Sequence, residues 1–113
     1  MEADGKEYLH LAEYQKWVAE GISPHVYSHD AHMQGAWSVM GLAAECGEVV
    51  ELIEKAIRKN QAADPEKIKD ELGDVLWYIA ACAYMFQIDL NDILEHNISK
   101  LNARRYKTLE EIA

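Results

Sequence analysis

The chain has 113 residues and a formal net charge of −9; half of the residues are hydrophobic and 27% are charged. This length supports one domain with a single core, which we expect to span residues 1–113, and this composition excludes a disordered chain. The negative charge argues against a protein that binds a nucleic acid polymer through its phosphates, because such binding needs clustered Lys and Arg.

Neither membrane insertion nor secretion is expected. The sequence has no run of about 18 apolar residues, and MEADGKEYLH at its start lacks the basic-then-apolar order of a secretory signal. Cys46 and Cys82 fall inside predicted helices without metal-binding spacing, so we expect two buried thiols rather than a disulfide. These features together predict a cytoplasmic protein.

The first 30 residues are predicted to form a helix and a loop. Apolar residues at helical spacing indicate a helix from Tyr8 to Glu20, and Gly21 is a natural stop. His25 to Asp30 is predicted as a loop, with Asp30 as the N-cap of the next helix.

The core motif region, 31–106, begins with a long helix predicted from Ala31 to Lys59. Three glycines interrupt it, and each costs the helix about 1 kcal/mol relative to Ala. We therefore expect a bend or a close helix contact near Gly41. Residues 60–64 form the connection that follows.

The third helix has a strong start: Asp64 as N-cap, Pro65 at the first position and Glu66 in the first turn. It is predicted to run to about Phe86. From Val75 onward it is almost wholly apolar, which predicts burial in a core or in an oligomer interface.

Asp89 is predicted to cap a fourth helix that runs from Leu90 to about Tyr106. Its apolar stripe consists of Leu90, Ile93, Leu94, Ile98 and Leu101. No alternating pattern typical of strands is present, so the sequence predicts an all-α fold, most simply a small four-helix bundle.

Two acid pairs stand out in the long helices. Glu45 and Glu48 are three residues apart, as are Glu71 and Asp74, and a glycine directly precedes the second acid of each pair. Each pair lies at the margin of an apolar stripe, so antiparallel packing of the two helices would bring four carboxylates together.

Four carboxylates in one cleft repel each other unless a cation lies among them. Their hard oxygen ligands suit Mg²⁺ or Mn²⁺. The alternative is that these acids are solvated or paired with lysines on the helix surface, and Lys55, Lys67 and Lys69 are available for such pairs.

These motifs resemble those of the MazG-like, all-α nucleoside triphosphate pyrophosphohydrolases, whose pattern is E-E-x-x-E, a spacer and E-x-x-D. Residues 44–48 (AECGE), a spacer of 22 residues and ELGD at 71–74 are similar to it. The resemblance covers about residues 33 to 106. It implies a metal site formed by Glu45, Glu48, Glu71 and Asp74, with Glu48 and Glu45 as catalytic candidates and Glu48 as the preferred base. Ala44 stands where the family has its first Glu.

The last predicted helix adds a second likeness. Asn97, Lys100 and Arg104 match the family's N-x-x-K-x-x-x-R stretch and fall on one helix face, where they could bind phosphate oxygens. The alternative is a basic helix end that complements the helix dipole. Trp37 and Trp77 are the aromatic candidates for contact with the base and the sugar.

The resemblance implies Mg²⁺-dependent hydrolysis of a (deoxy)nucleoside triphosphate at the α–β linkage, which yields a monophosphate and pyrophosphate. It also implies a homodimer or homotetramer with sites between subunits. The competing hypothesis is a helical dimerisation or regulatory module with little or no activity, and Ala44 gives that hypothesis its weight.

Overall fold

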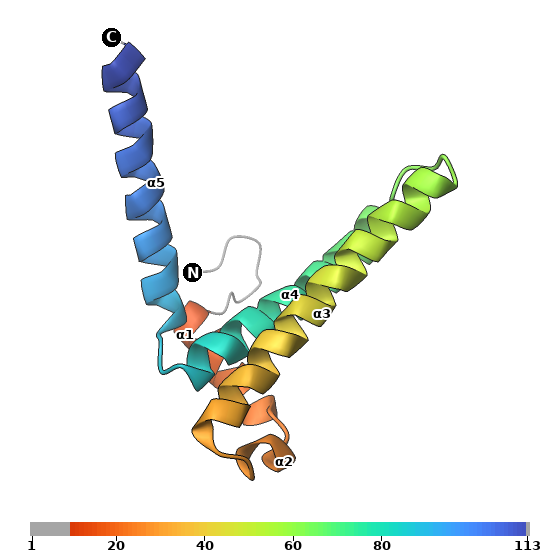
Figure 1. The fold of residues 1–113 in the computed structure, drawn as a ribbon, viewed down its shortest axis with the longest axis vertical. Helices are drawn as coiled ribbons and strands as arrows, with labels where there is room; N and C mark the ends of the chain where they lie inside the picture. The colour runs from red at the N-terminus through yellow and green to blue at the C-terminus, as the bar shows by residue number, and fades with distance from the viewer. Residues whose placement is uncertain (1–9, 113) are drawn as a thin grey trace, which may run out of the picture.

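Residues 10–112 are described by a computed structural model, and within them the chain forms five helices and no strand (Figure 1). The all-α prediction is confirmed. The helices are α1 (Leu11–Gly21), α2 (Pro24–Tyr27), α3 (Ala31–Arg58), α4 (Pro65–Met85) and α5 (Leu90–Ile112). Among the described residues, no helix combines the length and apolar character that a membrane span requires.

Three predicted boundaries differ from the structure. His10 is extended in front of α1, and the predicted start at Tyr8 lies outside the described residues. The loop predicted over 25–30 is wrong in part, because Pro24 starts a one-turn helix whose N-cap, Ser23, accepts a hydrogen bond from the His25 N–H. Helix α5 continues past Tyr106 to Ile112.

The predicted N-caps are confirmed. Asp30 Oδ1 accepts from the Met33 N–H at 2.9 Å, Asp64 Oδ1 from the Glu66 N–H at 3.0 Å, and Asp89 Oδ1 from the Asn91 N–H at 2.8 Å. Each carboxylate satisfies a first-turn donor and lies at the positive end of its helix. The three long helices therefore begin where local sequence dictates.

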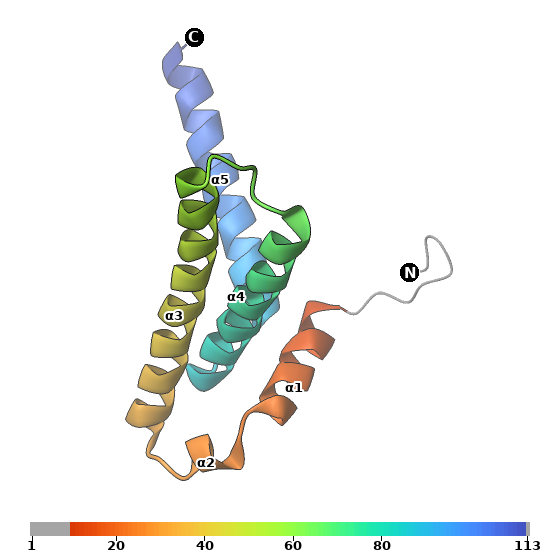
Figure 2. The same cartoon turned by 90° about the vertical axis from the view of Figure 1, so that its right-hand side faces the viewer.

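Helices α3 and α4 form the longest contact in the fold, an antiparallel hairpin (Figures 1 and 2). Both end in the same way. Asn60 (φ 53°) and Gln87 (φ 58°) adopt the left-handed conformation, and the following N–H groups of Gln61 and Ile88 bond back to Ala56 O and Ala83 O. These are Schellman motifs, which satisfy the last carbonyls and turn the chain sharply.

The core lies at one end of this hairpin, where α1 and the start of α5 meet α4 and where α2 meets α3. Its buried members are Val18, Ile22, Val26, Ala80, Ala81 and Leu90. Two alanines of α4 let α1 approach closely, and the aromatic side chains of Trp37 and Trp77 pack around the cluster. The apolar second half of α4 is thus partly buried, as predicted, although Leu76, Tyr84 and Phe86 remain exposed.

Gly41 makes the close helix contact that the sequence predicts. The ring of Tyr78 on α4 lies where a side chain at position 41 would project: a Cβ there would be 2.6 Å from Tyr78 Cδ1 and Cζ. The ring is held in turn by Trp37 and Trp77, with centroid distances of 5.6 and 5.0 Å. Only glycine fits here without moving the aromatic cluster.

Gln15 of α1 fixes the direction in which α5 leaves the hairpin. Its side-chain N–H donates to Ile88 O at 2.8 Å, and its Oε1 accepts from the Leu90 N–H at 3.0 Å. Because these bonds hold both sides of the α4–α5 turn, α5 diverges from the hairpin in a V (Figure 1) and makes no contact with α3 in the described part of the chain.

The chain is open for its size. Its radius of gyration is 17.9 Å, against about 13 Å for a compact domain of this length. Its accessible surface is 8879 Å², against about 6,300 Å² for a folded monomer of this mass. The ten terminal residues outside the described range can account for at most about 160 Å² each, the value for an unfolded chain. After that subtraction, roughly 1,000 Å² of the difference remains.

Much of that surface is apolar. All members of the predicted α5 stripe except Leu90 are exposed. Cys46 on α3 is exposed as well, so the prediction of two buried thiols is wrong for Cys46, whereas Cys82 is half-buried; both are free thiols. The error arises because Cys46 lies on an apolar face that nothing in one chain covers.

The Gly41 contact predicts opposite effects for two glycine substitutions. Gly41→Ala should lower the free energy of unfolding by about 1–2 kcal/mol, because displacing the Tyr78 ring costs more than alanine adds to the helix. Gly47→Ala should raise it by up to about 1 kcal/mol, because no atom lies within 4 Å of a Cβ at position 47. Urea unfolding measures both, and equal effects would contradict the contact.

Candidate metal and substrate site

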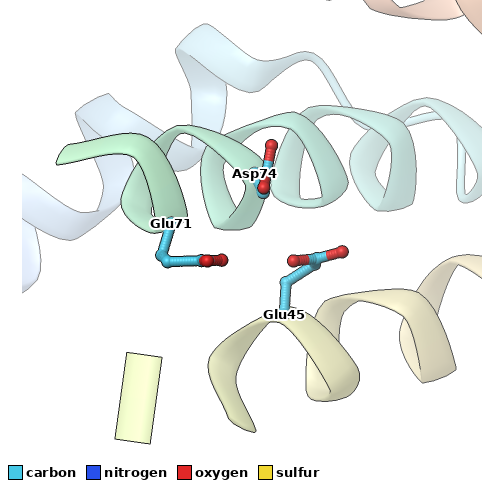
Figure 3. A group of neighbouring side chains, drawn as sticks. All are labelled: Glu45, Glu71 and Asp74. Carbon is cyan, nitrogen blue, oxygen red and sulfur yellow. The ribbon is translucent and has the colours of Figure 1, made fainter. Parts of the chain in front are cut away.

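Three acids converge between the hairpin helices. Glu45 on α3 and Glu71 and Asp74 on α4 each offer a carboxylate oxygen, and these oxygens all lie within 4.8 Å of one another. Figure 3 shows Glu45 and Glu71 extending into the space between the helices, with Asp74 one turn along α4. Glu45 and Glu71 are half-buried and Asp74 is exposed, so the group is both held by packing and open to solvent.

Glu48, the fourth predicted ligand, is exposed and does not belong to this group in the described structure. It is still close enough to act electrostatically. Burial raises the pKa of the Glu71 carboxyl, and the negative charges of Asp74, Glu48, Glu45 and Asp70 raise it further. The four motif acids therefore form one negative field centred on Glu71.

Among the residues that the structure describes, no salt bridge joins a lysine to these acids. The alternative of ordinary surface ion pairs predicted partners for the acids, yet the salt bridges of the described residues join Arg58 to Glu54 and Lys69 to Glu66. A site with three carboxylates and no protein cation fits a hard divalent ion, because Mg²⁺ takes few carboxylates and leaves positions for water or phosphate oxygens. The donor set therefore suits Mg²⁺ or Mn²⁺.

The glycines beside the acids leave space. A Cβ at Gly47 or at Gly73 would meet no atom within 4 Å, although each glycine costs its helix about 1 kcal/mol relative to Ala. The backbone directly before Glu48 and Asp74 is thus accessible to a ligand or to another chain.

The aromatic candidates lie beside the acids, toward the core. Trp37, Trp77 and Tyr78 form one cluster, with a Trp37–Trp77 centroid distance of 6.4 Å and nearly perpendicular rings. Trp77 and Tyr78 are three and four residues after Asp74, about one helical turn. The tryptophans are half-buried, so they serve the core on one side and keep part of each ring accessible.

The basic residues predicted on the last helix are not brought to the acids within one chain. Asn97 and Lys100 line a hollow of about 310 Å³ together with Asp92 and His96 of α5. Arg104 is exposed one turn further along. In the described residues α5 does not contact α3, and it diverges from the hairpin that carries the acids (Figure 1).

Tyr14 of α1 lies near the site, and the sequence offered no signal for it. It is half-buried and stacks on Trp17 with ring centroids 5.9 Å apart. Burial raises the pKa of its hydroxyl, and so does the negative charge of Asp74. Tyr14 precedes the acid motifs by more than 30 residues, so only the packing of α1 on α4 identifies it.

The electrostatics of Glu71 predict a pH-dependent stability. Because the pKa of Glu71 is raised in the folded chain, the folded state holds this proton more tightly than the unfolded state. The free energy of unfolding in EDTA should therefore fall as pH rises from the ordinary value of 4.5 through the raised pKa. Glu71→Gln should remove that fall.

Urea unfolding between about pH 4 and pH 8 measures the effect. The matched control is Glu110→Gln, which changes an exposed acid of α5 and should keep the wild-type pH dependence. A Glu71→Gln profile parallel to the wild type would show that the acids do not interact.

Comparison with known proteins supports a family assignment. The sequence profile of the MazG nucleotide pyrophosphohydrolase domain matches residues 37–109, which include all four motif acids. The chain is also similar to the Gene 37 protein of Mycobacterium phage L5, with 31% identity over 102 residues that cover 86% of this chain and 90% of that protein. No solved structure matches the chain.

The profile spans well over half of the chain, and the phage protein matches it over most of its length. The helical hairpin and its acids lie within the matched residues. The chain belongs to the MazG nucleotide pyrophosphohydrolase family.

Proposed function

We propose that this protein hydrolyses (deoxy)nucleoside triphosphates at the α–β phosphate linkage, to a nucleoside monophosphate and pyrophosphate, and so clears or balances nucleotide pools. The observation that carries the proposal is the convergence of Glu45, Glu71 and Asp74 at the family's motif positions. A cytoplasmic location follows as part of the proposal, because its substrates are cellular nucleotides.

The acids would have separate roles. Glu45, Glu71 and Asp74 would hold Mg²⁺, with Glu48 at the edge of the site. A bound ion would supply positive charge that neutralises the phosphate oxygens of the substrate. Glu48 is exposed and outside the three-acid group, so its carboxylate can accept the proton of the attacking water, with Glu45 as the other candidate. Water oxygen bonds to the α-phosphorus, the bridging P–O bond to the β-phosphate breaks, and pyrophosphate leaves with that electron pair.

The nucleoside would contact the exposed edges of Trp37 and Trp77. Asn97, Lys100 and Arg104 remain proposed phosphate ligands, acting on the acid site of a second copy because α5 diverges from its own hairpin. This arrangement requires a homo-oligomer, a dimer or a tetramer.

The uncovered apolar surface of the hairpin also favours association with a second copy of the chain. On α3, six exposed apolar residues follow one another at alternating intervals of four and three: Val39, Ala43, Cys46, Val50, Ile53 and Ile57. That spacing is the pattern of a coiled-coil seam. On α4, Leu72, Leu76 and Ile79 repeat it, and helical periodicity places both stripes on the same side of an antiparallel hairpin.

The excess surface of the chain is large enough for a stable interface. The whole chain, α5 included, exposes roughly 1,000 Å² more than a monomer of this mass, and a standard interface buries about 800 Å² on each partner. The occupant would have to present a long apolar helical surface, and a second copy of this chain offers one.

The metal site predicts both a stability and an activity effect. Mg²⁺ at about 100 times its Kd should stabilise the protein by about 2.7 kcal/mol, and turnover on a panel of ribo-, deoxyribo- and modified triphosphates should release pyrophosphate only with metal. Asp74→Asn should abolish both effects, whereas Glu110→Gln, which removes one exposed carboxylate of α5, should keep both. A folded protein with no metal shift and no turnover would favour the helical regulatory module.

The apolar seam predicts an oligomer that one charge disrupts. Val50→Glu would bury a charge in the seam and should weaken association at least about 100-fold, from a cost of about 3 kcal/mol. Met40→Glu is the control, because Met40 and Val50 are both 66% exposed on α3 but only Val50 lies in the seam. Sedimentation velocity separates them; a monomeric wild type, or equal loss in both variants, would contradict the proposal.

A further inference from the structure

Three lysines meet at the tip of the hairpin, where α3 ends and α4 begins. Figure 1 shows this tip at the end of the hairpin remote from α5. Lys55 lies in the last turn of α3, Lys59 is the C-cap of that helix, and Lys67 lies in the first turn of α4. They line one hollow of about 280 Å³, whose other walls include Gln61 and Asp64 of the connection.

These lysines make no salt bridge in the described part of the chain, although the protein has 20 acids for 11 basic residues. The neighbouring cations do pair: Arg58 with Glu54 at 3.0 Å and Lys69 with Glu66 at 2.7 Å. Lys55 and Lys59 complement the dipole of α3, but Lys67 lies at the positive end of α4, where a cation is unfavourable.

The three lysines outnumber Asp64, the one acid that lines the same hollow, so the hollow carries a net positive charge. Like charges gathered around one hollow repel each other, and an anion relieves the repulsion. The lysine hollow therefore favours an anion with several charges that fits a space open to solvent.

The hollow lies in line with the acids. Lys55 is seven residues after Glu48 on α3, and Lys67 is seven residues before Asp74 on α4. Seven residues are two helical turns, about 10 Å, so each lysine lies on the same side of its helix as that acid. Trp37 and Trp77 lie beyond the acids in the other direction. The hairpin thus presents an aromatic cluster, an acid group and a lysine hollow in that order.

We infer that Lys55, Lys59 and Lys67 bind the terminal phosphates of the substrate, the two that leave as pyrophosphate. This inference rests on the proposed function and extends it: the order of the three clusters matches base, α-phosphate and terminal phosphates. A lysine ammonium is a compact point charge with rotatable donors, which suits phosphate oxygens in a solvated hollow. The lysines then select triphosphates over monophosphates.

The double variant Lys55→Gln/Lys67→Gln tests the inference with steady-state kinetics and Mg²⁺. We expect the KM for a deoxynucleoside triphosphate to rise about tenfold with kcat little changed, and the affinity for the monophosphate to stay the same. The control, Arg58→Gln/Lys69→Gln, removes two tip cations that do not line the hollow and should behave as wild type. An unchanged KM in the first variant, or an equal rise in the control, would overturn the inference.

Calorimetry and NMR with inorganic tripolyphosphate, in EDTA and low salt, separate this inference from the proposed function. By calorimetry, the wild-type protein should bind the probe in a salt-dependent manner, and Lys55→Gln/Lys67→Gln should lose that binding. By NMR, the probe should shift the backbone amide signals of residues 55–67 in the wild type. Binding at the tip without nucleotide turnover would contradict the proposed function but support the anion site. Turnover without such binding would contradict the anion site alone.

Discussion

The packing of Tyr78 against Gly41 sets the register of α3 against α4, and the candidate site depends on that register. Glu45 is four residues after Gly41, and Asp74 is four residues before Tyr78. In an antiparallel pair these steps bring the two acids to the same level, and a further step of three residues along each helix brings Glu48 to the level of Glu71. Neighbouring carboxylates repel each other, and their charges add to the effect of burial in raising the pKa of Glu71. The helix contact therefore holds together acids that electrostatics would separate.

The hairpin carries three surfaces that a single chain leaves incomplete. The acids suit a cation, the tip lysines suit an anion, and the apolar seam of α3 suits a neighbouring helix. A magnesium triphosphate and a second copy would complete all three in the proposed account. The open shape then has a physical reason: the core around Val18 and Ala80 stabilises one end of the hairpin, and ligands and a partner would cover the rest.

Local chemistry made much of this fold predictable. Asp30, Asp64 and Asp89 marked the helix starts because a carboxylate caps only the donors next to it. The direction of α5 was not predictable, since Gln15 sets it through bonds to residues 73 and 75 positions away. Gln87 gave no helix-end signal, because glutamine rarely adopts positive φ. In the site, spacing identified the acids, whereas Tyr14 and the lysine hollow arise from packing that no single motif encodes.

The central claim is that packing of the two helices builds a divalent cation site from the motif acids. Crystals grown with Mn²⁺ and measured for anomalous scattering at the manganese edge test it most directly. The account predicts an anomalous peak between Glu45, Glu71 and Asp74, with oxygen ligands from all three carboxylates and no peak in Asp74→Asn crystals. A well-ordered hairpin with these acids solvated and no peak among them, in Mn²⁺ well above millimolar, would contradict it.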